Sequence, residues 1–256
     1  DDCNWVAERA ITSCELSIGG QRVDKHYQKW WRLYSELYLD ESKKATWGKM
    51  TTGATGKTVY LPLIFFFNRN PGLYLPLIAL QYHEVRIDFD LASNFTTFLN
   101  TDTFKVWANY VYLDTEERRR FAQKGHEYLI EQVQHTGTDT VTSNGTKQVR
   151  LSYNHPVKEL VWCFSNVSTN KNTLWNFSNV STDAGIVLES STLASEANCF
   201  VAPALMGSPL VATGLAGGSA QFTEDALGPM NTFKLIVNGQ DRFKEQKGKY
   251  FNQVQA

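Results

Sequence analysis

The segment 59–91 constrains the fold of this chain more than any other, because short apolar runs alternate in it with turn-forming residues. It opens with an apolar run of seven residues, 61–67, which stops at the turn sequence NRNPG. Seven residues are too few for a core helix, so the run predicts a strand buried on both faces. Pro71 and Pro76 prevent one continuous helix after it, although a single turn over 75–80 fits the sequence.

The last part of the same segment alternates strictly between charged and apolar residues. The charged positions are Glu84, Arg86, Asp88 and Asp90, and the apolar positions are Val85, Ile87, Phe89 and Leu91. A period of two is typical of a strand with one face in the core and the other in solvent. We therefore predict a half-buried strand here.

Two other segments have the pattern of β-hairpins. LSIGGQ at 16–21 and LIVNGQ at 235–240 each place a turn pair, Gly-Gly or Asn-Gly, after an alternating run. Both pairs favour two-residue hairpin turns. The segments lie 219 residues apart, and we interpret them as one hairpin repeated in two homologous domains. That offset in 256 residues leads us to expect that neither domain is complete here.

Helical periodicity occurs at two places. Aromatic residues recur at helix spacing over 27–38, with Asp24 as a candidate N-cap. The segment 114–124 predicts a short helix that Asp114 caps and Gly125 ends. We place the domain boundary just beyond this second helix.

The predicted domains are 1–131, which ends with that helix as its closing linker, and 132–256. The remaining segments are predicted as a polar loop at 42–57, strands at 104–113, 149–153 and 158–164, and a long loop at 181–228. A connection as long as the last is usually functional in a compact β protein.

The composition excludes two classes of partner. The chain has 25 basic and 26 acidic residues and a net charge of −1, so it lacks the positive field that holds nucleic acid by counterion release. Its apolar runs are far shorter than the ~20 residues of a membrane span. The chain does not begin with Met, and we interpret it as a piece of a longer protein.

No motif in the chain predicts catalysis, a metal or a cofactor. The sequence GATGKT at 53–58 resembles a phosphate-binding loop, but that motif requires Gly where this chain has Thr51. His83-Glu84 and His126-Glu127 do not extend to the HExxH motif of zinc proteases. The four cysteines have no metal-binding spacing, and we expect buried or strand-facing thiols; they are Cys3, Cys14, Cys163 and Cys199.

Five asparagines lie in N-x-[ST] sequons and are candidate glycosylation sites: Asn94, Asn144, Asn166, Asn176 and Asn179. The sequence FSNVST occurs at 164–169 and again at 177–182, and this duplicated segment predicts a surface loop. Asn- and Ser-rich loops also generate sequons freely, so unoccupied asparagines remain the alternative.

The sequence LPLIFFFNRNPGLYLPLIALQYHEV at 61–85 resembles the signature segment of the major capsid proteins of large nucleocytoplasmic DNA viruses, especially those of algal viruses. Three more segments match this family in the same order, at 16–27, 112–132 and 237–251. The resemblance implies an all-β fold of two tandem jelly rolls with short helices in the connections. It also implies that 181–228 contributes to an outward-facing tower.

In function, the resemblance implies a structural protein rather than an enzyme. Three copies would form a homotrimer with a pseudo-hexagonal outline, and these capsomers would tile an icosahedral shell. The expected partners are other copies, neighbouring capsomers and minor capsid proteins, and the expected location is the virion, after assembly in the cytoplasm of the infected host cell.

Two alternatives belong to other classes. A carbohydrate-binding β-sandwich module would need exposed Trp and Tyr side chains among its loops. A jelly-roll enzyme of the cupin kind would need two or three histidines and a carboxylate inside the barrel, and the five scattered histidines do not indicate such a set.

Overall fold

The computed structural model describes residues 5–53, 58–93, 96, 99–100, 104–141, 145–164 and 230–255. The chain forms two compact units. One comprises Val6–Leu33 and Tyr60–Leu160, and the other comprises Asp1–Trp5, Tyr34–Val59 and Val161–Ala256. Within the described part of the chain, no helix has the length and apolar character needed to cross a membrane.

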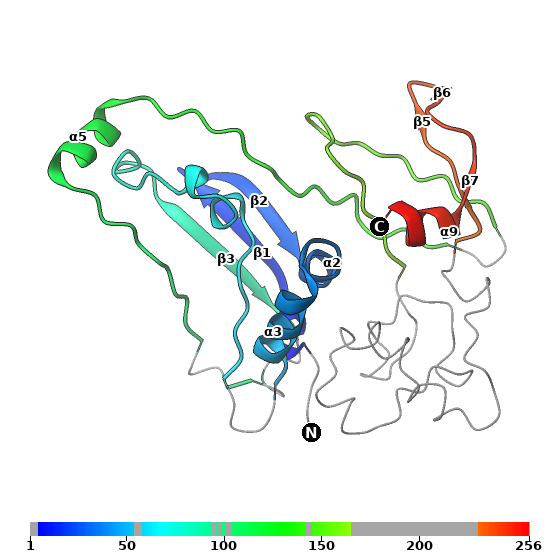
Figure 1. Cartoon of the computed structure of the whole chain (residues 1–256), viewed down its shortest axis with the longest axis horizontal. Coiled ribbons are helices and arrows are strands. Elements are labelled where there is room, and N and C mark those ends of the chain that lie inside the picture. Colours follow the sequence, from blue (N-terminus) through cyan, green and yellow to red (C-terminus); the bar gives the residue numbers. More distant parts are fainter. Residues whose placement is uncertain are drawn as a thin grey trace. The chain divides into compact units, whose positions relative to one another are not determined.

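An antiparallel three-stranded sheet is the centre of the first unit (Figure 1). Its strands are β1 (Ile11–Ile18), β2 (Gln21–Tyr27) and β3 (Val85–Leu91), in the order β2-β1-β3. The β1–β2 turn has positive φ at both central residues, 60° at Gly19 and 79° at Gly20, which is the two-residue hairpin turn that Gly-Gly favours. The predicted hairpin and the predicted half-buried strand are both confirmed.

The core of this unit lies on one face of β1. Cys14 and Leu16 have no exposed surface, and neither do Trp31 and Phe65. In the sheet, Cys14 pairs with Phe89 and Leu16 pairs with Ile87, so the apolar face of β3 continues the core face of β1.

Three helices flank this sheet in the sequence: α1 (Val6–Ala10), α2 (Gln28–Tyr38) and α3 (Glu41–Thr51). The helix predicted from the aromatic spacing is confirmed as α2. The predicted cap is wrong, because Asp24 pairs with Leu16 and β2 continues to Tyr27.

The polar loop predicted at 42–57 is also wrong over much of its length, because α3 occupies 41–51. The Asp40 carboxylate caps this helix and accepts a hydrogen bond of 3.1 Å from the amide of Lys43. Trp47 is buried on the helix, whereas most of its other residues are polar. Because the apolar face of α3 has so few residues, the sequence shows almost no helical periodicity there.

The apolar run 61–67 is buried as predicted towards its end, at Ile64, Phe65 and Phe66, but it forms no strand. A 3₁₀ helix, η1 (Phe66–Asn68), ends it. The guanidinium of Arg69 donates to the carbonyl of Ile64 at 3.2 Å, so a side chain takes the place of a neighbouring strand there. A second 3₁₀ helix, η2 (Pro71–Leu73), follows, and hydrogen bonds such as Ala79 N to Pro76 O at 2.8 Å confirm the predicted turn over 75–80.

The helix predicted after Asp114 is α5 (Thr115–Gln123), and the Asp114 carboxylate accepts from the amide of Glu117 at 2.8 Å. The segments 104–113, 149–153 and 158–164, predicted as strands, are not assigned to any strand. Among the described residues the sheets contain only β1 to β7. The long loop predicted at 181–228 lies outside the described residues.

The second unit contains short strand pairs and an aromatic cluster. β4 (Thr232–Phe233) pairs with β7 (Gln246–Lys247), and β5 (Ile236–Val237) pairs with β6 (Gln240–Asp241). The predicted Asn-Gly turn joins β5 to β6, with φ of 52° at Asn238 and 78° at Gly239. After β7 come α9 (Gly248–Tyr250) and η7 (Phe251–Gln255). The Phe233 ring lies 4.6 Å from that of Trp162 and 5.1 Å from that of Phe251.

Candidate functional site

Residues 128–135, which we name the strap, follow the free edge of β2. That edge is open to other contacts because the strand order is β2-β1-β3. The side-chain amide of Gln132 donates to the carbonyl of Val23, and the ring of His135 lies 4.8 Å from that of Tyr27. The strap therefore runs in the same direction as β2, and side chains make these contacts in place of a backbone ladder.

Asp24 on β2 joins the strap to the core. Its Oδ1 accepts from the amide of Val133 at 3.0 Å and from that of Lys25 at 2.9 Å. Its Oδ2 lies 2.9 Å from Nε2 of His26, a fully buried residue whose ring stacks on Phe65 with 4.6 Å between ring centres. One buried carboxylate thus contacts both the apolar core and the strap.

The first half of the strap contacts two other segments of the same unit. Glu131 accepts from Nζ of Lys158 at 2.6 Å and from Nη1 of Arg69 at 3.1 Å. The hydrogen bond from Lys158 holds the pKa of the Glu131 carboxyl below its ordinary value, and the charges of Lys158 and Arg69 act in the same direction. The hydroxyl of Tyr128 donates to the carbonyl of Tyr74 at 2.9 Å, and burial raises its pKa.

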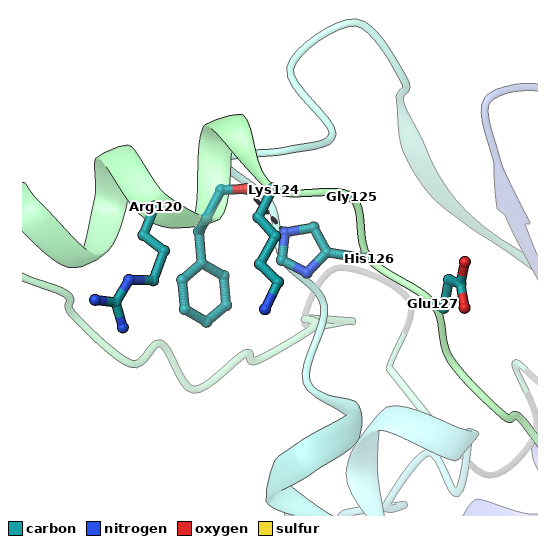
Figure 2. Close-up of a pocket in the computed structure, with 6 residues that line it drawn as sticks. Arg120, Lys124, Gly125, His126 and Glu127 are labelled. Atoms are coloured by element: carbon teal, nitrogen blue, oxygen red, sulfur yellow. Dashed lines mark hydrogen bonds between the residues drawn. The ribbon is translucent and has the colours of Figure 1, made fainter.

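A shallow pocket lies at the carboxyl end of α5, before the strap begins. Figure 2 shows His126 turned towards the end of the helix, where its Nε2 lies 2.8 Å from the carbonyl oxygen of Phe121, whereas Glu127 points away. Arg120 and Lys124 are exposed on the same wall. The histidine therefore contacts the last turn of the helix, and no carboxylate in the pocket faces it as an acid–base partner.

Metal-binding geometry is also missing from the described residues, where no group of three or more His, Cys, Asp or Glu side chains comes together. Among the predicted thiols, Cys14 is buried, and burial, with the nearby charges of Asp24 and Asp88, raises its pKa to about 12. A thiol with that pKa is protonated and unreactive at neutral pH. Cys163 is half-buried, and Cys3 and Cys199 lie outside the described residues.

Exposed aromatic residues are concentrated in the extended segment 104–112. Trp107 is 81% exposed and Tyr112 is 93% exposed, while Phe104 at the start of the segment packs against Phe89 at 5.3 Å between ring centres. Large exposed apolar side chains in one stretch mark an interaction surface more often than a solvated one.

The five candidate glycosylation sites, Asn94, Asn144, Asn166, Asn176 and Asn179, lie outside the described residues. Sequence reasoning missed the strap and the part that Asp24 plays in it. The one signal in the sequence was Asp24 itself, a charged residue that lies between Val23 and the aromatic side chains of His26 and Tyr27.

Two family models match the chain in tandem. "Major capsid protein N-terminus" matches residues 2–114, and "Large eukaryotic DNA virus major capsid protein" matches residues 117–256. The sequence is 40% identical to the major capsid protein of Paramecium bursaria Chlorella virus 1 over 98% of this chain and 58% of that protein. It is 33% identical to the major capsid protein of Phaeocystis pouchetii virus over 98% of this chain and 66% of that protein.

Two solved structures resemble the whole chain. One is a quasi-atomic model of the PBCV-1 virus capsid, with a TM-score of 0.68 at 36% identity. The other is the crystal structure of PBCV-1 VP54 fitted into a reconstruction of the virophage Sputnik, with a TM-score of 0.69. Each likeness covers 99% of this chain and 63% of the solved chain, so this chain spans about three fifths of these relatives. The capsid protein in them is a double jelly roll, which confirms the predicted all-β tandem fold class.

Proposed function

Because this chain belongs to the family of major capsid proteins of large eukaryotic DNA viruses, we propose that it is a structural subunit of a viral capsid. The observation that carries the proposal is the likeness to a subunit of the PBCV-1 capsid over 99% of the chain. The relatives that match are capsid proteins, which are structural proteins and not enzymes, and we assign no catalytic role to this chain.

The proposed mechanism is geometric. Two jelly rolls side by side give each subunit two lobes, so a homotrimer presents six lobes with a pseudo-hexagonal outline. Lateral contacts between such capsomers are individually modest, and the shell becomes stable through their number. The exposed aromatic segment 104–112 supports this proposal, because it offers apolar area for such contacts.

We divide the sequence of the subunit into the domains 1–131 and 132–256, a division that differs from the compact units because residues 132–160 lie in the unit of the three-stranded sheet. Two observations support the division. The two family models meet between residues 114 and 117, shortly before this boundary. The turns at Gly19-Gly20 and Asn238-Gly239 both have positive φ at their two central residues. They also join strands in the same register, Ile18 opposite Gln21 and Val237 opposite Gln240.

The proposed partners are other copies of this chain, neighbouring capsomers and minor capsid proteins, with no direct contact to nucleic acid, and the proposed location is the virion after assembly in the host cytoplasm. The sequons Asn94, Asn144, Asn166, Asn176 and Asn179 are proposed as glycan sites. Mass spectrometry of peptides from purified particles tests them, since an occupied site adds the mass of its sugars and a bare one does not.

Light scattering on the purified intact protein tests the oligomeric state. We expect a trimer, which for this chain is three times 29.0 kDa. A stable monomer at micromolar concentration would contradict the trimer. Electron microscopy of the same sample under assembly conditions then tests the capsid role, because hexagonal capsomers or shells are expected and isolated globular subunits are not.

A further inference from the structure

We propose that the strap, residues 128–135, is a built-in cover that prevents the edge of β2 from pairing with a strand of another chain. This inference goes beyond the proposed capsid role, since it concerns how the subunit avoids wrong contacts before and during assembly.

The need for a cover follows from the sheet order. β1 is paired on both sides, with β2 and β3, so β2 has backbone groups that face away from β1. An uncovered edge of seven residues is a template for strand addition, which leads to aggregation or domain swapping. The outward edge of β2 therefore needs a partner that does not itself continue the sheet.

The strap has that property. It lies beside β2 from Val23 to Tyr27, and side chains make its contacts with the strand. The side-chain amide of Gln132 donates to the Val23 carbonyl, the Asp24 carboxylate accepts from the Val133 amide, and the ring of His135 lies against that of Tyr27. Because the strap forms no strand of its own, it does not present a new edge to the next molecule.

The strap is held at several points along its length. Asp24 is 4% exposed, so its hydrogen bond to the Val133 amide is shielded from competing water. Two residues before Val133, Glu131 lies between Lys158 and Arg69, and at the first residue of the strap Tyr128 donates to the Tyr74 carbonyl. The ion pairs of Glu131 are partly exposed and individually weak, so the Asp24 contact is the principal anchor.

Hydrogen exchange of the intact protein, resolved to the Val133 amide, tests the anchor. The test variant is Gln132→Ala combined with His135→Ala, which removes two exposed strap side chains without disturbing the core. The matched control is Gln134→Ala, because Gln134 is exposed on the same segment but bonds to the backbone of Asn154. We expect the double variant to speed exchange at Val133 several-fold, and the control to leave it unchanged.

Asp24→Ala removes the anchor itself, and loss of a hydrogen bond to a charged acceptor predicts about tenfold faster exchange or more at Val133. Asp24→Asn keeps the volume and one acceptor oxygen, so it is expected to fall between wild type and Asp24→Ala. If Asp24→Ala fails to fold, the double variant decides the question.

Light scattering on the same variants tests the cover. We expect the double variant to form species larger than the wild-type oligomer in a concentration-dependent manner, and Gln134→Ala to match wild type. Faster exchange at Val133 without this added association would overturn the proposal, and so would unchanged exchange. The oligomeric state of the wild-type protein tests the proposed capsid function separately. A monomeric wild type would contradict that function, and the comparison between the variants would still test the strap.

Discussion

The two hairpin turns allow the energetic cost of positive φ for an L-residue to be measured in both halves of the chain. Gly20 and Gly239 have φ of 79° and 78°, and a Cβ added at either would meet no atom within 4 Å. Alanine at these positions therefore costs only backbone energy, about 1–2 kcal/mol for an L-residue in the left-handed region. The smaller conformational entropy of the unfolded chain offsets about 0.4–1 kcal/mol of this. We expect Gly20→Ala and Gly239→Ala each to destabilise their hairpin by about 1 kcal/mol.

Gly19 provides the contrast, because its φ is 60° and an added Cβ would lie 2.8 Å from Nδ1 of His83. Gly19→Ala therefore has the backbone cost and a steric cost. His83 is exposed and can rotate, so we place the steric cost at about 1 kcal/mol, the low end for overpacking. In the double variant with His83→Ala, Gly19→Ala is expected to cost no more than Gly20→Ala. Gly19→Asn combined with His83→Ala is expected to be near neutral, because Asn tolerates this region, as Asn238 does at φ 52°.

Urea unfolding of the full chain, followed by tryptophan fluorescence, measures the free energy of unfolding for each variant. A double-mutant cycle between Gly19→Ala and His83→Ala isolates their coupling. A neutral Gly20→Ala would contradict the backbone cost of positive φ, and a Gly19→Ala that cost the same with and without His83 would contradict the steric contact.

Three further predictions concern single groups. Cys14 is expected to resist iodoacetamide at pH 8 in the folded protein while the half-buried Cys163 reacts, as peptide mapping would show. Because the pKa of the Cys14 thiol is raised from 9.0 to about 12, its contribution to the free energy of unfolding is constant below pH 9 and falls as the pH rises from 9 towards 12. Rapid labelling of Cys14 would contradict its burial. Glu131→Gln is expected to lower the free energy of unfolding by about 0–1 kcal/mol at pH 7, since the ion pairs of Glu131 are exposed. Because the pKa of the Glu131 carboxyl is lowered in the folded protein, the difference in stability between wild type and variant vanishes as the pH falls through that pKa. A difference that stayed the same in acid would contradict the ion pairs as its source. Trp107→Ser is expected to weaken capsomer assembly in light scattering more than Tyr82→Ser, which changes a still more exposed aromatic residue outside 104–112. Equal effects of the two substitutions would exclude the segment 104–112 from the interface.

Elements encoded by neighbouring residues could be predicted from the sequence. The turn pairs at 19–20 and 238–239, the alternation over 84–91 and the Asp114 cap each depend on a few adjacent residues whose conformational preferences agree. The repeated hairpin sequence indicated two homologous domains, and the family resemblance supplied their jelly-roll architecture.

Elements that depend on distant contacts could not be predicted. The run 61–67 is buried towards its end, but the Arg69 guanidinium donates to the carbonyl of Ile64 and a 3₁₀ helix follows. Apolar character alone therefore predicted a strand wrongly. Asp24 has the residue type of a cap and instead binds Val133, 109 residues away. The helix α3 has a single large apolar anchor, Trp47, and a pattern of one residue has no period.

The central claim is that one subunit contains two copies of the same β module. A cryo-EM reconstruction of the assembled protein, at a resolution that shows side chains, tests it most directly. We expect the hairpins at 16–21 and 235–240 to occupy equivalent positions in the two lobes and to superpose when one lobe is rotated onto the other. Hairpins at unrelated positions in the two lobes would contradict it.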